Sequence, residues 1–224
     1  MDRRFLGILA VIIVIFVGIF VASKNSGNGG SGSSNNGAQP SSHTSGQGST
    51  GVTFTEYGDY ECPVCAEYNP VVDQVEQQFT KQITYQFRNL PLTQIHPNAF
   101  AAARAAEAAG LQNKYFDMHN KLYANQNQWA SASDPKSFFD TYAKAIGLNI
   151  SQFDTDYLSS KVNDVINADL AAFAKTGQQM ATPTFFLDGT YIDNSKLIDS
   201  TTGQPSVSKF ASLINAEIAK KQAK

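Results

Sequence analysis

The sequence is poor in cysteine: it has two in 224 residues, Cys62 and Cys65, which form one Cys-x-x-Cys pattern. No cysteine remains for a structural disulfide elsewhere or for a four-thiolate metal site. A zinc site with this spacing needs two more Cys or His ligands, and the three histidines lie far apart, at His43, His96 and His119. A purely structural disulfide would close a short loop, where the gain from restricting the unfolded chain is smallest. The pair therefore favours redox chemistry over the two alternatives, zinc binding and cross-linking.

The sequence also lacks an excess of basic over acidic residues. It carries 17 Lys and Arg against 19 Asp and Glu, a formal net charge of −2 at pH 7, whereas a nucleic-acid-binding protein needs a basic face. No Gly-rich phosphate loop, Ser/His/Asp arrangement or carboxylate pair stands out. The sequence therefore predicts no nucleic-acid partner, no bound cofactor and no metal ion.

The first cysteine stands at the start of a predicted helix. Residues 52–57 alternate in character, as expected for a strand, and a short turn follows. Pro63 is favoured at the first helical position, which puts Cys62 near the N-cap. Unpaired N–H groups and the positive end of the helix dipole stabilise a thiolate there. Cys62 is thus the expected accessible nucleophile, and Cys65, one turn further in, is the expected shielded resolving thiol.

The strand alternation also concerns Glu56, six residues before Cys62, which shares a face with Val52 and Phe54. We expect its carboxyl group to point into the core beneath the cysteines, where burial raises a carboxyl pKa. The alternative is a partly exposed glutamate at a strand end, because a register slip turns a side chain to the other face.

Three segments together carry a family resemblance. The first is the strand, the Gly-Asp-Tyr-x-Cys-Pro-x-Cys turn and the helix behind it, which contains a proline. The second is the run 180–186, in which Thr182 and Pro183 enter a predicted strand, and the third combines the segment from His96 with the run 114–119. The combination resembles the DsbA-like family of extracytoplasmic thiol:disulfide oxidoreductases, within the thioredoxin superfamily, over roughly residues 51–222.

The resemblance implies a fold and a set of site residues. The fold is α/β, a thioredoxin fold with an inserted α-helical domain at about 96–176. Thr182-Pro183 is implied to be a cis bond, which is rare enough to have a purpose, and to lie beside Cys62. Glu56 matches the acidic residue that is thought to shuttle the proton of Cys65 in DsbA-like proteins.

The resemblance also implies a function, a thiol oxidase that introduces disulfide bonds into exported, unfolded or reduced proteins. A membrane-embedded, quinone-linked partner would reoxidise the pair, and the enzyme is expected to be a monomer. The dipeptide between the cysteines, Pro63-Val64, lacks the His of the most oxidising relatives, so disulfide isomerase or reductase activity stays open. A peptide-binding chaperone whose cysteine pair is merely structural is the second alternative.

Two segments are expected to precede the domain at 51–224. Arg3 and Arg4 come before an uncharged apolar run of 18 residues, Phe5 to Ala22, which as a helix would span roughly 27 Å, about the hydrocarbon thickness of a bilayer. Residues 1–23 are therefore predicted to be an uncleaved membrane anchor, with a cleavable signal peptide as the alternative. The two arginines favour a cytoplasmic N-terminus, so the catalytic domain of this single-pass protein would lie on the extracytoplasmic side of the cell membrane.

The second segment is residues 24–50, which consist mostly of Ser, Gly, Asn and Gln. It has too few apolar side chains to form a core, so it is predicted to be a disordered linker in which His43 is incidental. Within the domain, alternation predicts another strand at 83–87, Asp188-Gly189 predicts a hairpin turn, and apolar spacing predicts a closing helix around 207–218.

Overall fold

The computed structural model describes residues 37–223. The predicted anchor at 1–23 and the part of the predicted linker before residue 37 lie outside these described residues. No helix within residues 37–223 is long and apolar enough to cross a membrane.

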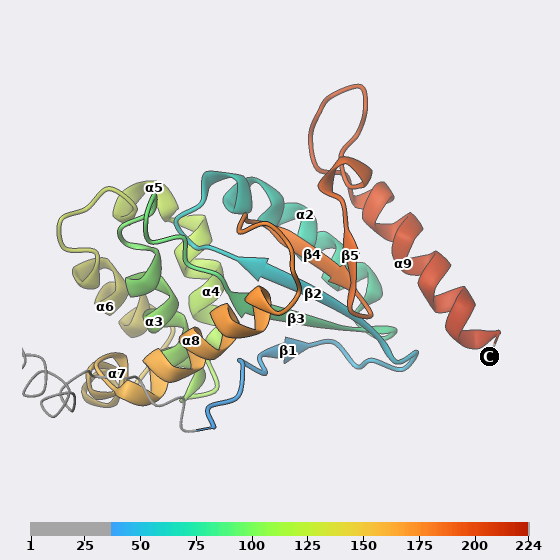
Figure 1. Ribbon diagram of the computed structural model, residues 1–224. Coiled ribbons are helices and arrows are strands. Elements are labelled where there is room, and N and C mark those ends of the chain that lie inside the picture. The colour runs from blue at the N-terminus through green and yellow to red at the C-terminus, as the bar shows by residue number, and fades with distance from the viewer. Residues whose placement is uncertain (1–36, 224) are drawn as a thin grey trace, which may run out of the picture. The chain divides into compact units, whose positions relative to one another are not determined.

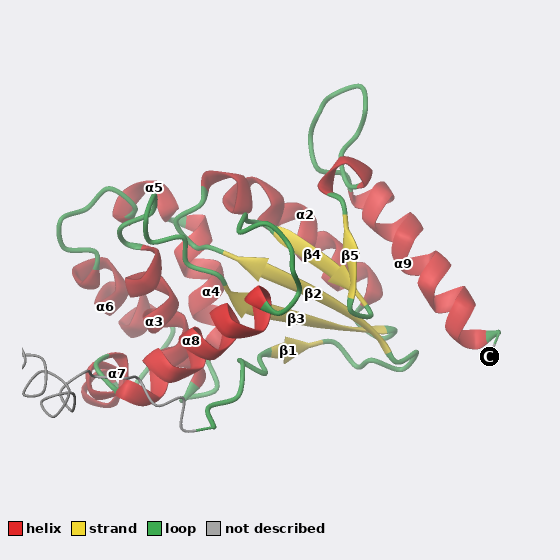
Figure 2. Ribbon diagram, in the orientation of Figure 1, coloured by secondary structure: helices red, strands yellow, loops and turns green. Residues whose placement is uncertain are grey.

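A mixed sheet of five strands forms the centre of the described domain, in the order β1-β3-β2-β4-β5 (Figures 1 and 2). Strands β2 and β3 run parallel, and the other neighbouring pairs are antiparallel. The strands are β1 (Thr44–Ser45), β2 (Val52–Gly58), β3 (Ile83–Asn89), β4 (Thr184–Leu187) and β5 (Thr190–Ile192). This thioredoxin-like α/β arrangement places the predicted strand before the cysteines at the middle of the sheet.

Helices cover both faces of the sheet and fill the long stretch between β3 and β4. Helices α2 (Pro63–Phe79) and α9 (Val207–Gln222) pack together on one face, and a short 3-10 helix, η1 (Asn194–Lys196), precedes α9. Six helices occupy the stretch in which an α-helical insertion at about 96–176 is predicted. They are α3 (Ala99–Gly110), α4 (Tyr115–Ala124), α5 (Gln126–Trp129), α6 (Lys136–Ala145), α7 (Ile150–Tyr157) and α8 (Ser160–Ala174).

The alternation of β2 explains which face each of its residues occupies. Val52, Phe54 and Glu56 are buried on the face that meets α2 and α9, where the Phe54 ring packs against Phe185 and Phe210 at centroid distances of 5.5 and 5.7 Å. Aromatic side chains bury a large apolar area each, so this cluster supplies much of the hydrophobic stabilisation of the sheet.

The predicted hairpin is confirmed. Strands β4 and β5 pair antiparallel across Asp188 and Gly189, whose φ angles are 48° and 76°. A two-residue hairpin turn of the type that matches strand twist needs positive φ at both central residues, and an Asp-Gly pair meets this requirement at low cost.

The prediction of a disordered linker up to residue 50 is wrong for residues 37–50, which we call the N-terminal strap. Its strand β1 pairs with β3, with Thr44 opposite Gln86 and Ser45 opposite Tyr85. The end of the strap is fixed by backbone N–H groups of residues 47–50, which donate to carbonyl groups of residues 80–83 at 2.7 to 3.1 Å. Composition missed this order because backbone hydrogen bonds, rather than apolar side chains, hold the strap.

His43 is not incidental either. Its ring stacks on Tyr115 at a centroid distance of 3.6 Å, and its Nε2 atom lies 2.8 Å from Glu107 Oε2. These contacts join the strap to α3 and α4, so His43 has a structural role in the domain.

Candidate active site

The two cysteines sit at the N-terminus of α2 as free thiols. Cys62 is the N-cap residue and Pro63 follows at the first helical position, as predicted. Cys65 has no exposed surface, and Cys62 is only 5 % exposed. The expectation of an accessible Cys62 is therefore wrong in degree, since the loop before β4 comes within 3.5 Å of the sulfur, although Cys62 remains the more exposed of the two.

The surroundings shift the pKa values of the two thiols in opposite directions. The pKa of Cys62 is lowered to about 6, chiefly by a hydrogen bond from the Cys65 thiol; burial opposes the shift, and hydrogen bonds from the Thr182 side chain and the backbone at Cys65 and Val64 contribute to it. Complete burial, followed by the neighbouring Cys62, raises the pKa of Cys65 well above its usual range. Cys62 is thus a thiolate near neutral pH while Cys65 stays protonated, which makes Cys62 the nucleophile of the pair.

The loop before β4 meets the cysteines. The Thr182-Pro183 bond is cis, as the sequence predicts. The Cys62 sulfur lies 3.5 Å from the Thr182 carbonyl oxygen, which accepts its proton when Cys62 is protonated, so the predicted position of this bond beside Cys62 is confirmed.

Glu56 lies buried on the predicted face of β2, with 2 % exposure. The Tyr85 hydroxyl donates a hydrogen bond to its Oε2 atom at 2.8 Å. Burial raises the pKa of Glu56 to about 8, the Tyr85 hydrogen bond counteracts part of this rise, and the charges of Asp73 and Cys62 add to it. Glu56 is therefore neutral at pH 7 and can give up or accept a proton near that pH.

The active-site loop is held by residues that no sequence motif connects with it. The Gln126 side-chain amide donates to the carbonyl oxygens of Tyr60 and Cys62 at 2.8 and 2.9 Å. The Asp59 carboxylate lies 2.8 Å from the His96 ring. These partners stand 37 to 66 positions apart in the chain, and no local pattern signals such a contact.

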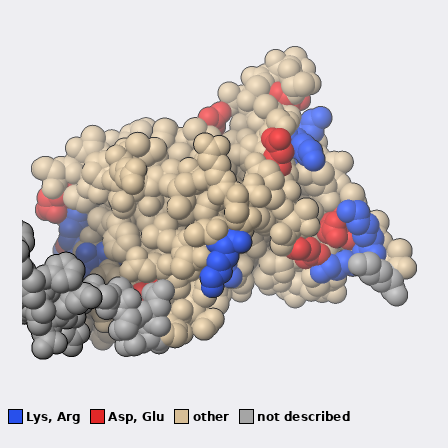
Figure 3. Space-filling view, in the orientation of Figure 1, with Lys and Arg blue, Asp and Glu red and all other residues tan. Residues whose placement is uncertain are grey.

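Apolar side chains are exposed next to the thiols. Val64, between the cysteines, is 43 % exposed, and Met180, two residues before Thr182, is 52 % exposed. The view in Figure 3 also shows a broad area without charged side chains over the helical insertion. An uncharged, partly apolar surface next to the thiols is better suited to binding a polypeptide than to binding a charged small molecule.

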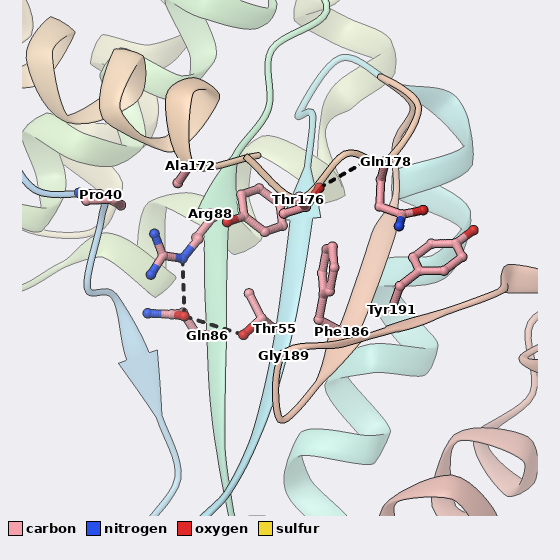
Figure 4. Close-up of a pocket in the computed structure, with 11 residues that line it drawn as sticks. Pro40, Thr55, Gln86, Arg88, Ala172, Thr176, Gln178, Phe186, Gly189 and Tyr191 are labelled. Atoms are coloured by element: carbon pink, nitrogen blue, oxygen red, sulfur yellow. Dashed lines mark hydrogen bonds between the residues drawn. The ribbon is translucent and has the colours of Figure 1, made fainter. Parts of the chain in front are cut away.

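A separate hollow of about 450 Å³ opens on the other face of the sheet (Figure 4). Its lining includes Thr55, Tyr57, Arg88 and Phe186 but neither cysteine. Since side chains alternate along β2, this hollow and Glu56 lie on opposite faces of the sheet. Within residues 37–223, no group of three or more His, Cys, Asp or Glu side chains is placed to hold a metal ion.

A family model described as Thioredoxin matches residues 38–204 of the chain. Sequence relatives include the Na(+)/H(+) antiporter NhaA 1 of Mycobacterium sp. (strain KMS), 38 % identical over 151 residues, and its namesake in Salinispora arenicola, 37 % identical over 153 residues. Each match covers 66 % of this chain but only 23 % and 22 % of the antiporter. The chain thus spans under a quarter of the length of these curated relatives.

Solved structures are similar in fold at low sequence identity. Oxidised BdbD of Bacillus subtilis is 20 % identical with a TM-score of 0.66, covering 82 % of this chain and 94 % of that one. The alpha-DsbA1 protein of Wolbachia pipientis is 20 % identical with a TM-score of 0.65, covering 85 % and 98 %. MdbA of Corynebacterium diphtheriae, a thiol-disulfide oxidoreductase, is 22 % identical with a TM-score of 0.55, covering 64 % and 78 %. These neighbours share the fold, and because the family model matches most of its length, this chain belongs to the thioredoxin family.

Proposed function

We propose that the protein is a thiol:disulfide oxidoreductase that acts as a thiol oxidase on exported proteins. The observation that carries this proposal is the opposite shift of the two thiol pKa values within one Cys-x-x-Cys pair. A purely structural pair has no need of a stabilised thiolate, whereas an exchange catalyst depends on one.

The reaction follows from this asymmetry. In the oxidised enzyme a substrate thiolate attacks the Cys62 sulfur, the Cys62–Cys65 bond breaks, and Cys65 leaves with the electron pair. Glu56, which is neutral at pH 7, supplies the proton that Cys65 takes up, as we propose from its burial and pKa. A second substrate thiolate then attacks the substrate sulfur of the mixed disulfide and expels the Cys62 thiolate. The substrate has lost two electrons to the enzyme, which is left as a dithiol.

The direction of net transfer follows from the stability of the reduced form. A Cys62 thiolate that is stabilised in the reduced enzyme makes reduction of the enzyme more favourable, and hence makes the enzyme a stronger oxidant. The dipeptide Pro63-Val64 leaves the size of this effect open, so isomerase or reductase activity is the alternative. A chaperone without redox activity fits the thiolate stabilisation at Cys62 less well.

The location and partners are part of the same proposal. The apolar run at 5–22 supports a membrane anchor with the catalytic domain outside the cytoplasm, where disulfides persist. The sequence relatives are named as ion antiporters, which work in membranes, and this agrees with a membrane-associated domain. Unfolded or reduced exported proteins would be the substrates of the monomeric enzyme, and a membrane-embedded, quinone-linked oxidase would reoxidise it.

Assays in both directions on one preparation test the activity. We expect oxidation of reduced model peptides by the disulfide form to be much faster than reduction of insulin by the dithiol form. Cys62→Ser should abolish both activities. Faster insulin reduction would indicate a reductase, and activity that survives Cys62→Ser would contradict the assigned nucleophile. The potential of the pair, measured against glutathione, then gives the oxidising strength.

Alkylation of the reduced protein tests the assignment of the two thiols. Label should enter Cys62 alone at mildly acidic pH, with a rate that levels off above about pH 6, where Cys62 is ionised. Cys65→Ala removes the hydrogen bond that contributes most to the ionisation of Cys62. In this variant the labelling rate of Cys62 should therefore level off at a higher pH. Cys65→Ser keeps a hydrogen-bond donor, so the pH at which labelling levels off should shift less. Labelling of Cys65 first, or at equal rate, would show the assignment to be wrong.

A further inference from the structure

The turn between β2 and α2 is centred on one carboxylate. The Asp59 side chain has no exposed surface. Its Oδ1 atom accepts the backbone N–H of Glu61 at 2.8 Å, and its Oδ2 atom accepts both the backbone N–H of Leu92 and the ring of His96, each at 2.8 Å. Asp59 therefore joins the turn before Cys62 to the loop that leads into the helical insertion.

Of the three groups that bond the Asp59 carboxylate, the His96 ring is the side chain, so a substitution can remove it while leaving the two backbone donors in place. A carboxylate can only accept hydrogen bonds, so the Nδ1 atom of His96 carries the proton in the neutral as well as the charged ring. The ring is 16 % exposed, and its own backbone N–H is fixed by the Leu92 carbonyl oxygen at 2.9 Å. The donor is thus held in place on the loop and points at Asp59.

The Asp59 backbone contacts the backbone of Cys62 and the thiol of Cys65. Its carbonyl oxygen accepts the Cys62 N–H at 3.1 Å, and the Tyr123 hydroxyl donates to the same oxygen at 3.4 Å. A hydrogen bond from the Asp59 backbone also lowers the pKa of Cys65, against the larger opposing effect of burial. A carboxylate that lost its His96 donor would be a buried charge with one acceptor site unmatched, and the peptide group would turn to compensate.

We propose that His96 is a positioning residue for the redox pair: its Nδ1–H fixes the Asp59 carboxylate, and through Asp59 it fixes the backbone groups that face Cys62 and Cys65. This inference rests on the proposed thiol–disulfide exchange function. His96, which lies in the loop before α3, contacts neither sulfur atom, yet through Asp59 it influences how strongly the reduced cysteine pair is stabilised.

The test compares three substitutions in the full chain. His96→Asn places an amide N–H close to the position of Nδ1 and should keep the contact, whereas His96→Gln and His96→Ala should lose it. We expect the equilibrium constant with glutathione to shift about tenfold towards the enzyme disulfide in the Gln and Ala variants, which is about 30 mV for a two-electron couple. His96→Asn should stay within about twofold of the wild type, since one retained hydrogen bond accounts for the difference.

His43→Ala is the matched control. His43 is also a partly exposed histidine bound to a buried carboxylate at 2.8 Å, that of Glu107, but it lies on the strap and contacts neither the active-site turn nor the cysteines. This variant should lose stability and keep the wild-type equilibrium constant. Equal constants in wild type, His96→Gln and His96→Ala would overturn the proposal, as would a shift in His96→Asn as large as in His96→Ala.

Alkylation separates failure of this inference from failure of the proposed function. The pH profile of Cys62 labelling needs no redox substrate, and it should move in His96→Gln but not in His96→Asn. A wild type without exchange activity would end the proposed function and leave this comparison intact. If His96→Ala does not fold, His96→Gln with the same two readouts decides the matter, and an unmoved labelling profile together with an unmoved constant contradicts the role of His96.

Discussion

Two buried carboxyl groups in this domain, those of Glu56 and Asp169, receive different numbers of hydrogen bonds from the protein. Glu56 receives one hydrogen bond from a described residue, from the Tyr85 hydroxyl at 2.8 Å. Asp169 on α8 receives three, from the backbone N–H of Ser41 at 2.8 Å, the backbone N–H of Asn89 at 2.9 Å and the Asn89 side chain at 3.3 Å. Arg88 adds a charge 3.6 Å from Asp169 Oδ1.

The number of donors decides which form of each acid is stable. Burial raises both pKa values, that of Glu56 to about 8 and that of Asp169 to about 6, and hydrogen bonds from Asn89 and Ser41 hold the second one down. At pH 7 Glu56 is therefore mostly neutral and Asp169 mostly ionised. A neutral acid beneath two thiols can exchange a proton, while an ionised one surrounded by donors from the strap and from β3 acts as a structural centre.

The largest effect should come from removing the structural centre. Asp169→Ala leaves the backbone N–H groups of Ser41 and Asn89 buried without an acceptor, so we expect the free energy of unfolding to fall by roughly 3 kcal/mol. Urea denaturation measures this loss. The thiol-oxidation rate of the folded variant should stay at the wild-type value. Asp164→Ala on the same helix is the control and should change stability by less than about 0.5 kcal/mol; an equal loss in both variants would remove the distinction between the two acids.

The next effect is kinetic. Glu56→Gln keeps the shape and neutrality of the acid but cannot exchange a proton, so the step in which Cys65 leaves as the mixed disulfide forms, and its reversal by resolution through Cys65, should slow by about 10²-fold across pH 5 to 8. The free energy of unfolding should match the wild type below about pH 4.5, where Glu56 is neutral in both states, and Glu56→Gln should be the more stable protein at neutral pH, because only the wild type has an acid that ionises on unfolding. Stopped-flow measurement of mixed-disulfide formation, and of its reversal in the absence of further substrate thiol, gives the rate, with Glu67→Gln on the surface of α2 as the control. Wild-type kinetics in Glu56→Gln would leave Glu56 as ordinary structure.

The third effect, which is small per pH unit, is a slope in the pH dependence of stability. The folded-state pKa of Glu56 is about 8 against an ordinary value of 4.5, so between these values the folded protein binds more protons and Glu56 makes stability fall as pH rises. The slope has a maximum of about 1.4 kcal/mol per pH unit. Asp169 makes stability fall with rising pH in the same way, but only between its ordinary pKa of 3.8 and its folded-state pKa of about 6.

Above pH 6.5 the difference between wild type and Glu56→Gln isolates this slope. Cys62, with a pKa lowered to about 6, acts in the opposite sense, but it titrates in both proteins. Burial lowers the pKa of His119 to about 3 from an ordinary 6.5, so this residue contributes only below pH 6.5. Parallel stability curves for the two proteins between pH 6.5 and 8 would show that Glu56 does not titrate there.

Local sequence alone determined the geometry at the two key elements of the site. Pro63 at the first helical position fixed Cys62 as the N-cap, and the strand alternation put Glu56 on the buried face. The Asp-Gly pair at 188–189 likewise specified its hairpin. Each of these features depends on φ preferences or on a two-residue period, which act within a few positions of the chain.

Only the tertiary structure decided how these elements are supported. The strap at 37–50 is polar in composition, yet it joins the sheet because its backbone finds partners in β3 and its His43 finds a stacking partner in Tyr115. The donors to Asp169 come from 80 and 128 positions away, and the donor to Asp59 comes from 37 positions away. Hydrogen-bond partners at such separations are set by how the whole chain packs, so the number of donors around a buried acid, and with it the pKa, is a property of the fold rather than of any local pattern.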